Sequence, residues 1–357
     1  MIPIAKPIIG RAEIRSVKKV LKSGNLAQGP EVRRFEDNFS KIVGDLDCVA
    51  VNSGTSALHV SLLALGIGAG DEVLIPSFTF AATANAVALT GARPIFVDIN
   101  PHTYNIDPAK LNSMINTKTR AIIAVHLFGL PSDLQTISKI AKSNNLLLVE
   151  DSAQAHMASI NDRPVGTFGD AAIFSFYPTK NMTTSEGGIC VFRDPAHSRI
   201  ARLLRNQGME TRYQNEIVGF NLRMTEIEAA IGIVQLKKLP SWTEKRIVNA
   251  AHLSQNIKLG ILPSVPAGFK HVFHQYTIRV KANRDKIVEE LNSNGIGTGV
   301  FYPTQVHRLP AFNESLNLIE TEAAVNQVFS IPVHPSLTKS DLKKITNKVN
   351  QALEKYV

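Results

Sequence analysis

Short apolar, β-branched runs alternate with helix-like stretches between residues 47 and 192. The runs cover seven segments: 48–51, 73–75, 94–97, 121–125, 146–149, 172–176 and 189–192. Strands of a parallel sheet that is covered on both faces are almost uniformly apolar, and helices connect them. The alternation therefore predicts an α/β domain built on a mostly parallel sheet of seven strands.

Helical patterns frame this region on both sides. Apolar residues recur at helical spacing over 14–21 and again over 32–42. After the last predicted strand, Thr225 with Glu228 three residues later matches a capping box, which predicts that a long helix begins there. Pro240 is expected to interrupt or kink this helix, because proline lacks the amide hydrogen that a helix interior needs.

The remaining chain has the pattern of a smaller α+β domain. It contains one strand-like segment near 276–280 and helix-like segments near 286–292 and 340–353. We therefore expect a large domain over residues 1–245 and a small C-terminal domain over residues 246–357.

Composition narrows the class of protein. The chain has 357 residues, 44% of them hydrophobic, and a mean hydropathy of +0.00, which excludes disordered and fibrous proteins. The 39 Lys and Arg against 30 Asp and Glu give a net charge of +9, which favours anionic partners. Because the basic residues are scattered and only 6% of residues are aromatic, a nucleic-acid groove is not favoured.

The chain shows no sign of secretion, of a membrane span or of a metal site. Its first residues lack a continuous apolar segment, and no run is long and apolar enough to cross a bilayer. Cys48 and Cys190 lie far apart and have no partners at disulfide or metal-site spacing. We therefore expect a cytoplasmic protein that uses no metal.

One candidate site follows the first predicted strand. Ser53, Gly54, Thr55 and Ser56 open the next predicted helix, at the edge of the sheet where α/β proteins collect ligands. A glycine that lets a ligand approach the backbone, two hydroxyls and the positive end of a helix suit a phosphate group. Taken alone, the segment is more simply explained as an ordinary helix cap.

Two further strand ends carry ionisable residues. Asp151 ends the apolar run that begins at Leu146, and a carboxylate there needs a cation or a hydrogen-bonding ligand. Lys180 follows another apolar strand, where burial can turn an amine into a nucleophile. Taken alone, Asp151 is compatible with a structural helix cap or ion pair, and Lys180 with a solvated position on the surface. Together with a phosphate cradle, however, they match pyridoxal phosphate, which needs a phosphate anchor, a partner for its pyridine nitrogen and a Schiff-base lysine.

At these residues the sequence resembles the DegT/DnrJ/EryC1/StrS family of pyridoxal-phosphate sugar aminotransferases, which have fold type I of the aspartate-aminotransferase-like group. The likeness extends over nearly the whole chain and includes these segments: 52–58, 70–73, 150–156, 166–170, 175–180, 186–188, 219–224 and 274–276. The resemblance implies a pyridoxal-phosphate transferase fold with a seven-stranded large domain and a smaller α+β domain.

The resemblance also implies roles for individual residues at the cofactor. Lys180 would form the Schiff base, Asp151 would pair with the pyridine nitrogen, Gln154 would contact the ring hydroxyl and Phe80 would stack on the ring. The phosphate would be held at Gly54 by Thr55, Ser56 and Ser175, and by Asn221 of a neighbouring subunit, so that a homodimer with shared active sites is implied. Arg223 would help to bind an anionic donor or substrate.

The implied reaction transfers the amino group of L-glutamate to a keto group of a nucleotide-linked sugar. One alternative is a sugar dehydratase of the same fold that uses pyridoxamine phosphate, but that branch replaces the Schiff-base lysine. A second alternative is a noncatalytic sensor or regulator that binds sugar nucleotides, against which the combined presence of Asp151, Gln154, Ser175 and Lys180 argues.

Some residues depart from the family pattern or remain without a catalytic role. Met157 and Ser185 stand where the family commonly has glycine, and we expect both near the cofactor wall, where they affect substrate fit. Pro303, Thr304 and His307 are candidates for substrate contacts by resemblance alone. The remaining histidines in ordered regions are interpreted as structural: His59, His126, His156 and His274.

Overall fold

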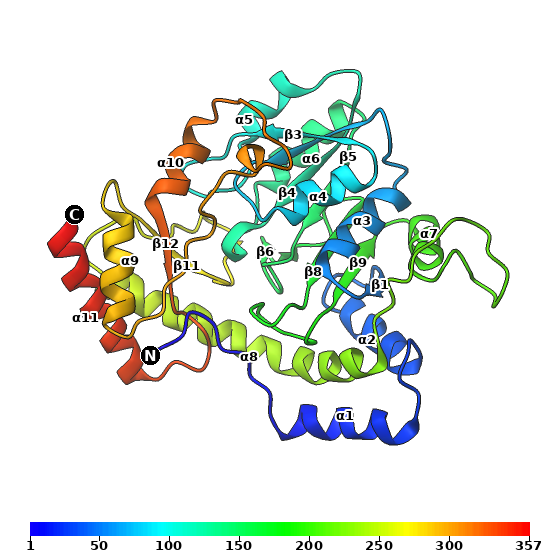
Figure 1. The fold of residues 1–357 in the computed structure, drawn as a ribbon, viewed down its shortest axis with the longest axis horizontal. Helices are drawn as coiled ribbons and strands as arrows, with labels where there is room; N and C mark the ends of the chain where they lie inside the picture. The colour runs from blue at the N-terminus through cyan, green and yellow to red at the C-terminus, as the bar shows by residue number, and fades with distance from the viewer.

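A seven-stranded sheet forms the centre of the protein. The computed structural model describes all residues, 1–357, and orders the sheet β1-β9-β8-β5-β4-β2-β3 (Figure 1). The strands are β1 (Asp47–Val51), β2 (Glu72–Pro76), β3 (Arg93–Val97), β4 (Thr119–Val125), β5 (Leu147–Asp151), β8 (Ala171–Ser175) and β9 (Gly188–Phe192). Only β9 runs antiparallel to its neighbours, β1 and β8. Each strand overlaps a predicted apolar run, so the predicted fold class is confirmed.

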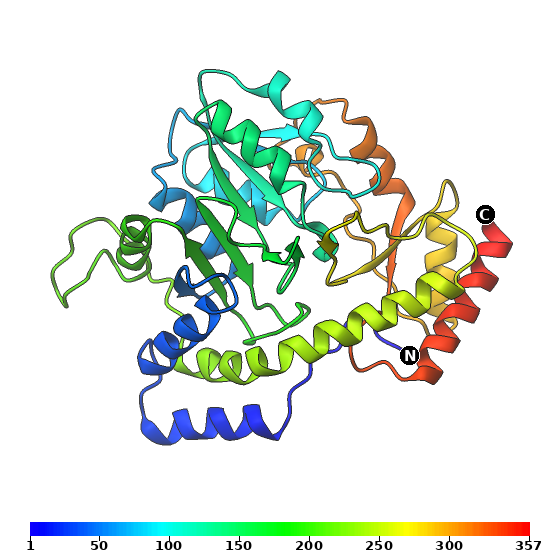
Figure 2. The same cartoon turned by 180° about the vertical axis from the view of Figure 1, so that it is seen from behind.

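Helices cover both faces of this sheet, as Figure 2 shows from behind. The helices before and within the sheet region are α1 (Arg11–Ser23), α2 (Pro30–Ser40), α3 (Gly54–Ala64), α4 (Ala82–Leu89), α5 (Pro108–Leu111), α6 (Leu134–Ser143) and α7 (Pro195–Arg205). The first two confirm the predicted helices over 14–21 and 32–42.

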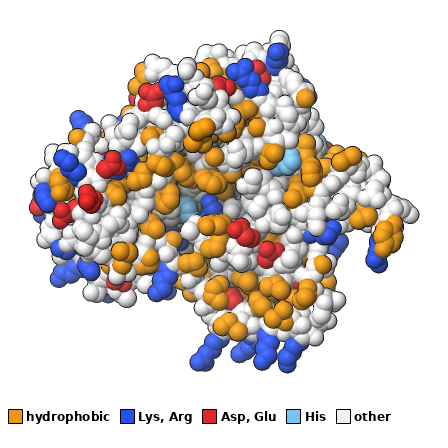
Figure 3. Space-filling view, in the orientation of Figure 1, with side chains coloured by type: hydrophobic (Ala, Val, Ile, Leu, Met, Phe, Trp, Pro, Cys, Tyr) orange, Lys and Arg blue, Asp and Glu red, His pale blue; other side chains and the backbone are white.

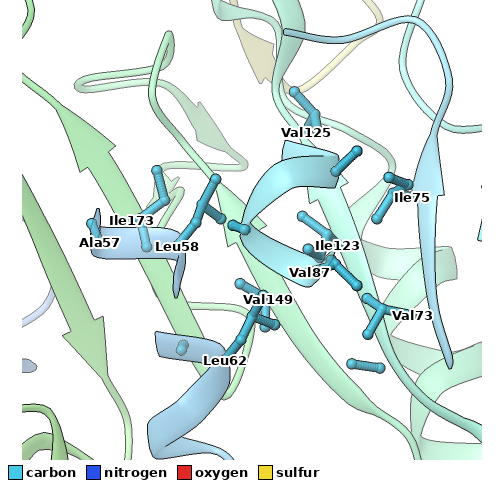
Figure 4. Packing of buried hydrophobic residues seen from close by; sticks show 14 of the residues in the cluster. Ala57, Leu58, Leu62, Val73, Ile75, Val87, Ile123, Val125, Val149 and Ile173 are labelled. Carbon is cyan, nitrogen blue, oxygen red and sulfur yellow. The ribbon is translucent and has the colours of Figure 1, made fainter. Parts of the chain in front are cut away.

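Successive residues of each central strand point to opposite faces of the sheet and therefore pack against different helices. Val73, Ile123 and Val149 pack with residues of α3 and α4 in one buried cluster (Figure 4). Their neighbours Leu74 and Ile122 belong to a second buried cluster, which includes residues of α2, α6 and α8 (Glu226–Asn256). The apolar runs are therefore continuous because both faces of the sheet are buried.

The long helix α8 begins where the sequence predicts it. Thr225 caps the helix, its hydroxyl accepting from the amide of Glu228, and the Glu228 carboxylate accepts from the amide of Thr225. The expected interruption at Pro240 does not occur, because α8 continues through this residue, while the alternative of a kink there stays a prediction. Packing explains the difference, since Leu239 and Trp242 are buried on either side of the proline and hold both halves in place.

The C-terminal part has its own hydrophobic cluster. Its elements are β11 (Tyr276–Arg279), α9 (Arg284–Ser293), α10 (Ile319–Gln327), β12 (Val328–Ile331) and α11 (Lys339–Tyr356). Three of them match the predicted strand and helices, whereas α10 and β12 were not predicted. The short strands β6 (Ser159–Ile160), β7 (Arg163–Pro164) and β10 (Phe269–Lys270) form a separate small sheet.

The proposed domain boundary lies inside α8, which connects the two parts (Figure 1). Ile2 packs into the C-terminal cluster, whereas Ala324 and Val325 of α10 pack into the core of the large sheet. The division at residues 245 and 246 therefore stays a prediction. None of the helices combines the length and the apolar character needed to cross a membrane.

A fully buried carboxylate, Glu150, fixes the chain around the end of β5. One of its oxygens accepts from the amides of Phe168 (2.7 Å) and Gly169 (2.8 Å), and the other accepts from the amide of Gly166 (2.7 Å). Three amides directed at one carboxylate compensate for the cost of burying its charge.

The amide side chain in Glu150→Gln should lower the free energy of unfolding by about 2 kcal/mol, because its NH2 group faces backbone donors and leaves them unpaired. Urea denaturation followed by circular dichroism measures the loss. Glu244→Gln is the control, because that side chain is 64% exposed and should change stability by less than about 0.5 kcal/mol. Equal stability of the two variants would contradict the role of Glu150.

Candidate active site

A cavity of about 410 Å³ lies at the carboxyl ends of the central strands. Segments that follow β1, β2, β5 and β8 line it, together with residues 274–275 and 301–302 of the C-terminal part. Figure 3, which keeps the orientation of Figure 1, shows hydrophobic side chains spread over the middle of the molecule, around a hollow. The predicted site residues that line the cavity are Gly54, Thr55, Phe80, Asp151, Gln154, Ser175 and Lys180.

Asp151 is the last residue of β5 and is only 5% exposed. One of its carboxylate oxygens accepts from the Thr83 hydroxyl at 2.9 Å, and the other accepts from the Ala153 amide at 3.2 Å. Burial raises the pKa of Asp151, while these two hydrogen bonds and the charge of Lys180 act in the opposite direction. The structure thus holds a carboxylate in a fixed orientation at the base of the cavity.

Lys180 lies on the wall of the same cavity, on the turn after β8. Its backbone amide donates to the carbonyl of Tyr177, but its side-chain amine has no hydrogen-bond partner. Burial lowers the pKa of Lys180 to about 8, and the charge of Asp151 opposes this shift. An amine with a lowered pKa is unprotonated more often at neutral pH and is therefore a better nucleophile.

The segment after β1 forms a tight cradle at the start of α3. Ser53 caps this helix by accepting from the Ser56 amide at 3.1 Å. Gly54 lies so close to Ser175 that a Cβ atom at residue 54 would come within 2.7 Å of the Ser175 Cβ. Only glycine therefore lets the helix N-terminus and the Ser175 hydroxyl face the same part of the cavity, where the helix dipole favours an anion.

The structure does not bring every predicted residue into the cavity. The Ser56 hydroxyl accepts from Ser53 at 2.9 Å, and Ser56 is not among the lining residues. Asn221 is exposed on the loop between α7 and α8, and Arg223 donates to the side chain of Asn206 at 2.9 Å. Neither lines the cavity of its own chain.

Met157 and Ser185 do not themselves line the cavity, although Glu186, which follows Ser185, does. Both have positive φ angles, 67° for Met157 and 82° for Ser185. Glycine adopts this conformation at little cost, which explains a preference for glycine at these positions without any contact with a ligand. The expected effect on substrate fit therefore has no support at either residue.

Thr83, His274 and Tyr302 are among the cavity residues that the sequence analysis did not assign to the site. His274 was interpreted as structural, yet it lines the cavity, and burial together with the nearby charge of Lys180 keeps its pKa well below the ordinary value. Of the candidates for substrate contacts, His307 is instead fully buried, with its Nδ1 atom 2.6 Å from the Ser77 hydroxyl. No pattern in a single sequence marks which side chains of distant segments meet in a cavity.

Comparison with known proteins agrees with this site. The family model described as the DegT/DnrJ/EryC1/StrS aminotransferase family matches residues 7–350. The chain belongs to this family. The match includes every segment that lines the cavity except Ile4 and Ala5.

Curated relatives of this family cover most of the chain. The chain is 37% identical to GDP-perosamine synthase of Caulobacter vibrioides, over 91% of either protein. It is 36% identical to UDP-N-acetyl-3-dehydro-alpha-D-glucosamine 3-aminotransferase of Acidithiobacillus ferrooxidans, over 95% of this chain and 93% of the relative. A Geobacillus stearothermophilus relative named pleiotropic regulatory protein is 36% identical, over 94% of this chain and 93% of the relative.

Solved structures of the family have the same fold. S. venezuelae DesV in complex with a ketimine intermediate superposes with a TM-score of 0.93 at 35% identity, over 96% of this chain and 94% of that chain. The putative sugar aminotransferase Spr1654 of Streptococcus pneumoniae in its PLP form superposes with a TM-score of 0.92 at 27% identity, over 99% of either chain.

The lowered pKa of Lys180 predicts selective labelling of its amine. In protein freed of cofactor, an amine-reactive reagent should modify Lys180 half-maximally near pH 8, whereas exposed lysines should need a pH near their ordinary pKa of about 10.4. Peptide mass spectrometry measures labelling at each pH. Asp151→Asn should shift the Lys180 profile to lower pH, because it removes the charge that favours the protonated amine. A Lys180 profile like that of exposed lysines would contradict this prediction.

Proposed function

We propose that the protein is a pyridoxal-phosphate-dependent aminotransferase that transfers the amino group of L-glutamate to a keto group of a nucleotide-linked sugar. The observation that carries the proposal is the joint position of Asp151, Lys180 and the Gly54 cradle on the wall of one cavity. Family membership and the solved neighbour in its PLP form support the same cofactor.

The side chains of the cavity fit pyridoxal phosphate at each of its polar groups. The N-terminus of α3 at Gly54 and Thr55, with the Ser175 hydroxyl, would hold the phosphate. Asp151 would pair with the pyridine nitrogen. The amine of Lys180, which has no partner within the chain, would bond to the aldehyde.

The remaining contacts concern the faces and edges of the ring. Gln154 would meet the ring hydroxyl, and Phe80, which is 58% exposed, would stack on the ring. Asp151, Gln154 and Phe80 would therefore provide a charged partner, a hydrogen-bonding side chain and an apolar face, respectively.

The bound cofactor supplies a ring that withdraws electrons from the carbon that loses a proton. With the cofactor bound, Asp151 would keep the pyridine nitrogen protonated, because a fixed carboxylate favours a positive charge beside it. The amine of Lys180 would take a proton from the donor carbon and return it to the carbon on the other side of the transferred nitrogen. Its pKa of about 8 suits both proton removal and proton return at neutral pH.

The names of two relatives support a nucleotide-linked sugar as the amino acceptor, since one names GDP-perosamine and the other a UDP-linked keto sugar. The net charge of +9 suits a substrate that carries a diphosphate and a donor with two carboxylates. Arg223 is proposed to help bind one of these anions. Two buried free thiols, Cys48 and Cys190, fit a reducing compartment, and we propose the cytoplasm.

A homodimer with shared active sites is part of the proposal. Asn221, exposed on the loop after α7, would reach the phosphate of the neighbouring subunit. Hydrophobic side chains on this loop and on α1 are solvent-exposed in the single chain, including Val218 at 89%, Ile14 at 61% and Leu21 at 54%. Exposed apolar surface of this kind is typical of a contact between subunits.

The alternatives are not favoured. The dehydratase branch lacks a Schiff-base lysine, whereas Lys180 is present and lines the cavity. One relative carries the name of a regulatory protein and another that of a sensory transduction protein, but the cavity retains the ionisable groups that catalysis needs.

The purified protein should be yellow, and L-glutamate should bleach it as the amino group moves to the cofactor. Borohydride should trap the cofactor on Lys180, and Lys180→Ala should lose this adduct. Absorbance and peptide mass spectrometry follow both changes. A colourless protein that takes up no pyridoxal phosphate would overturn the proposal, whereas a protein that consumes pyridoxamine phosphate and ignores glutamate would favour the dehydratase.

The acceptor is identified by offering a panel of nucleotide-linked keto sugars and scoring amination by mass spectrometry. At least one member should gain an amino group only when glutamate is present. If every sugar nucleotide remains unchanged while glutamate still bleaches the enzyme, the acceptor belongs to another class of ketone.

The cradle predicts that Gly54→Ala weakens cofactor binding at least about tenfold, or ~1.4 kcal/mol, because the new methyl group displaces Ser175 from the phosphate position. Fluorescence titration with pyridoxal phosphate measures the affinity. Gly68→Ala is the matched control, because the nearest atom to a Cβ there is 3.9 Å away. Unchanged affinity in Gly54→Ala would show that the phosphate binds elsewhere.

A further inference from the structure

The hydroxyl of Tyr302 has an unused hydrogen at the cavity wall. Its oxygen accepts from the Gln154 side-chain amide at 3.0 Å, and the other end of that amide accepts from the Phe128 backbone at 2.7 Å. This second contact fixes which end of the Gln154 amide is the donor. The Tyr302 hydroxyl hydrogen has no acceptor within the protein, although Tyr302 lines the cavity.

Neighbouring aromatic rings hold Tyr302 in place. Its ring centroid lies 5.8 Å from that of Phe80, 6.4 Å from that of Phe78 and 6.1 Å from that of Phe301. Burial and the nearby charge of Asp151 raise the pKa of Tyr302 above that of an ordinary tyrosine. The hydroxyl therefore stays protonated and is available as a hydrogen-bond donor.

The chemistry of the proposed cofactor indicates what this donor meets. In pyridoxal phosphate a single carbon separates the pyridine nitrogen from the carbon that bears the ring hydroxyl, and the phosphate arm is attached on the other side of the ring. With the nitrogen at Asp151 and the phosphate at the Gly54 cradle, the ring hydroxyl would face the other polar groups near Asp151. Gln154 follows Asp151 by three residues, and Tyr302, which is hydrogen-bonded to Gln154, is close enough for the charge of Asp151 to act on its hydroxyl.

We infer that Tyr302 is a further cofactor-binding residue, which donates its hydroxyl hydrogen to the ring oxygen of the bound cofactor. The second amide hydrogen of Gln154 is not used within the protein and would be free to donate to the same oxygen, so that two donors would stabilise its negative charge. The inference rests on the proposed function, because it assumes that the cavity holds pyridoxal phosphate. Tyr302 lies in the C-terminal part of the chain, whereas the other cofactor contacts proposed within the same chain come from the ends of strands of the large sheet or from segments that follow them.

The test measures whether Tyr302 and the ring oxygen interact. Pyridoxamine phosphate and its analogue without the ring hydroxyl are titrated into cofactor-free protein, since neither can bond covalently to Lys180. The wild-type protein should bind the analogue at least about tenfold more weakly, as expected for lost hydrogen bonds to a charged oxygen. The Tyr302→Phe variant keeps the ring and its packing. In this variant the ratio of the two dissociation constants, analogue over pyridoxamine phosphate, should be at least about fivefold smaller than in the wild-type protein, because one of the two donors is already absent.

Tyr104→Phe is the matched control for removal of a buried hydroxyl. Tyr104 belongs to the same aromatic cluster, with its ring 6.2 Å from that of Phe78, but it does not line the cavity. This variant should keep the wild-type ratio between the two ligands.

The remaining outcomes separate this inference from the proposed function. If Tyr302→Phe weakens both ligands by the same factor, Tyr302 only shapes the cavity and the inference is wrong. If the variant changes neither affinity, the hydroxyl does not meet the cofactor and the inference is equally wrong. If the wild-type protein binds neither ligand, the proposed function itself fails.

Discussion

The site depends on one buried charge, the carboxylate of Asp151 at the end of the central strand β5. Burial of a carboxylate is costly unless partners compensate for it. Here β4 and β8 flank the strand in register, with Val125 and Ile173 opposite Asp151, and Thr83 and Ala153 hydrogen-bond its two oxygens. The remaining compensation comes from positive charge, which Lys180 and the nitrogen of a bound ring would supply.

The rest of the cavity follows from how the sheet presents its strand ends. Parallel neighbours bring the last residue of β4 and the residues after β2 and β5 to the same edge, and β8 adds Ser175 and the turn that carries Lys180. The cradle at Gly54 comes from the start of α3, whose amides point at the same space. A single edge thus collects an anion site, a carboxylate and an amine, the three groups that one cofactor requires.

Much of the fold could be predicted because burial determines it directly. The strands coincide with apolar runs, and the start of α8 coincides with the capping box at Thr225, since both signals are local. Local signals failed where packing outweighs them. Pro240 lies within a continuous helix, and α10 was not predicted because only part of its short length is buried.

The sequence by itself singled out Asp151, Lys180 and the glycine of the cradle as candidates, because each follows an apolar strand at the edge of the sheet where α/β proteins collect ligands. Only the tertiary structure decided which side chains complete the cavity. Thr83, His274 and Tyr302 come from segments separated by up to 219 positions, counted from 302 − 83, and meet through packing of the C-terminal part against the sheet. Such meetings depend on the three-dimensional path of the chain, which no local pattern of residue types encodes.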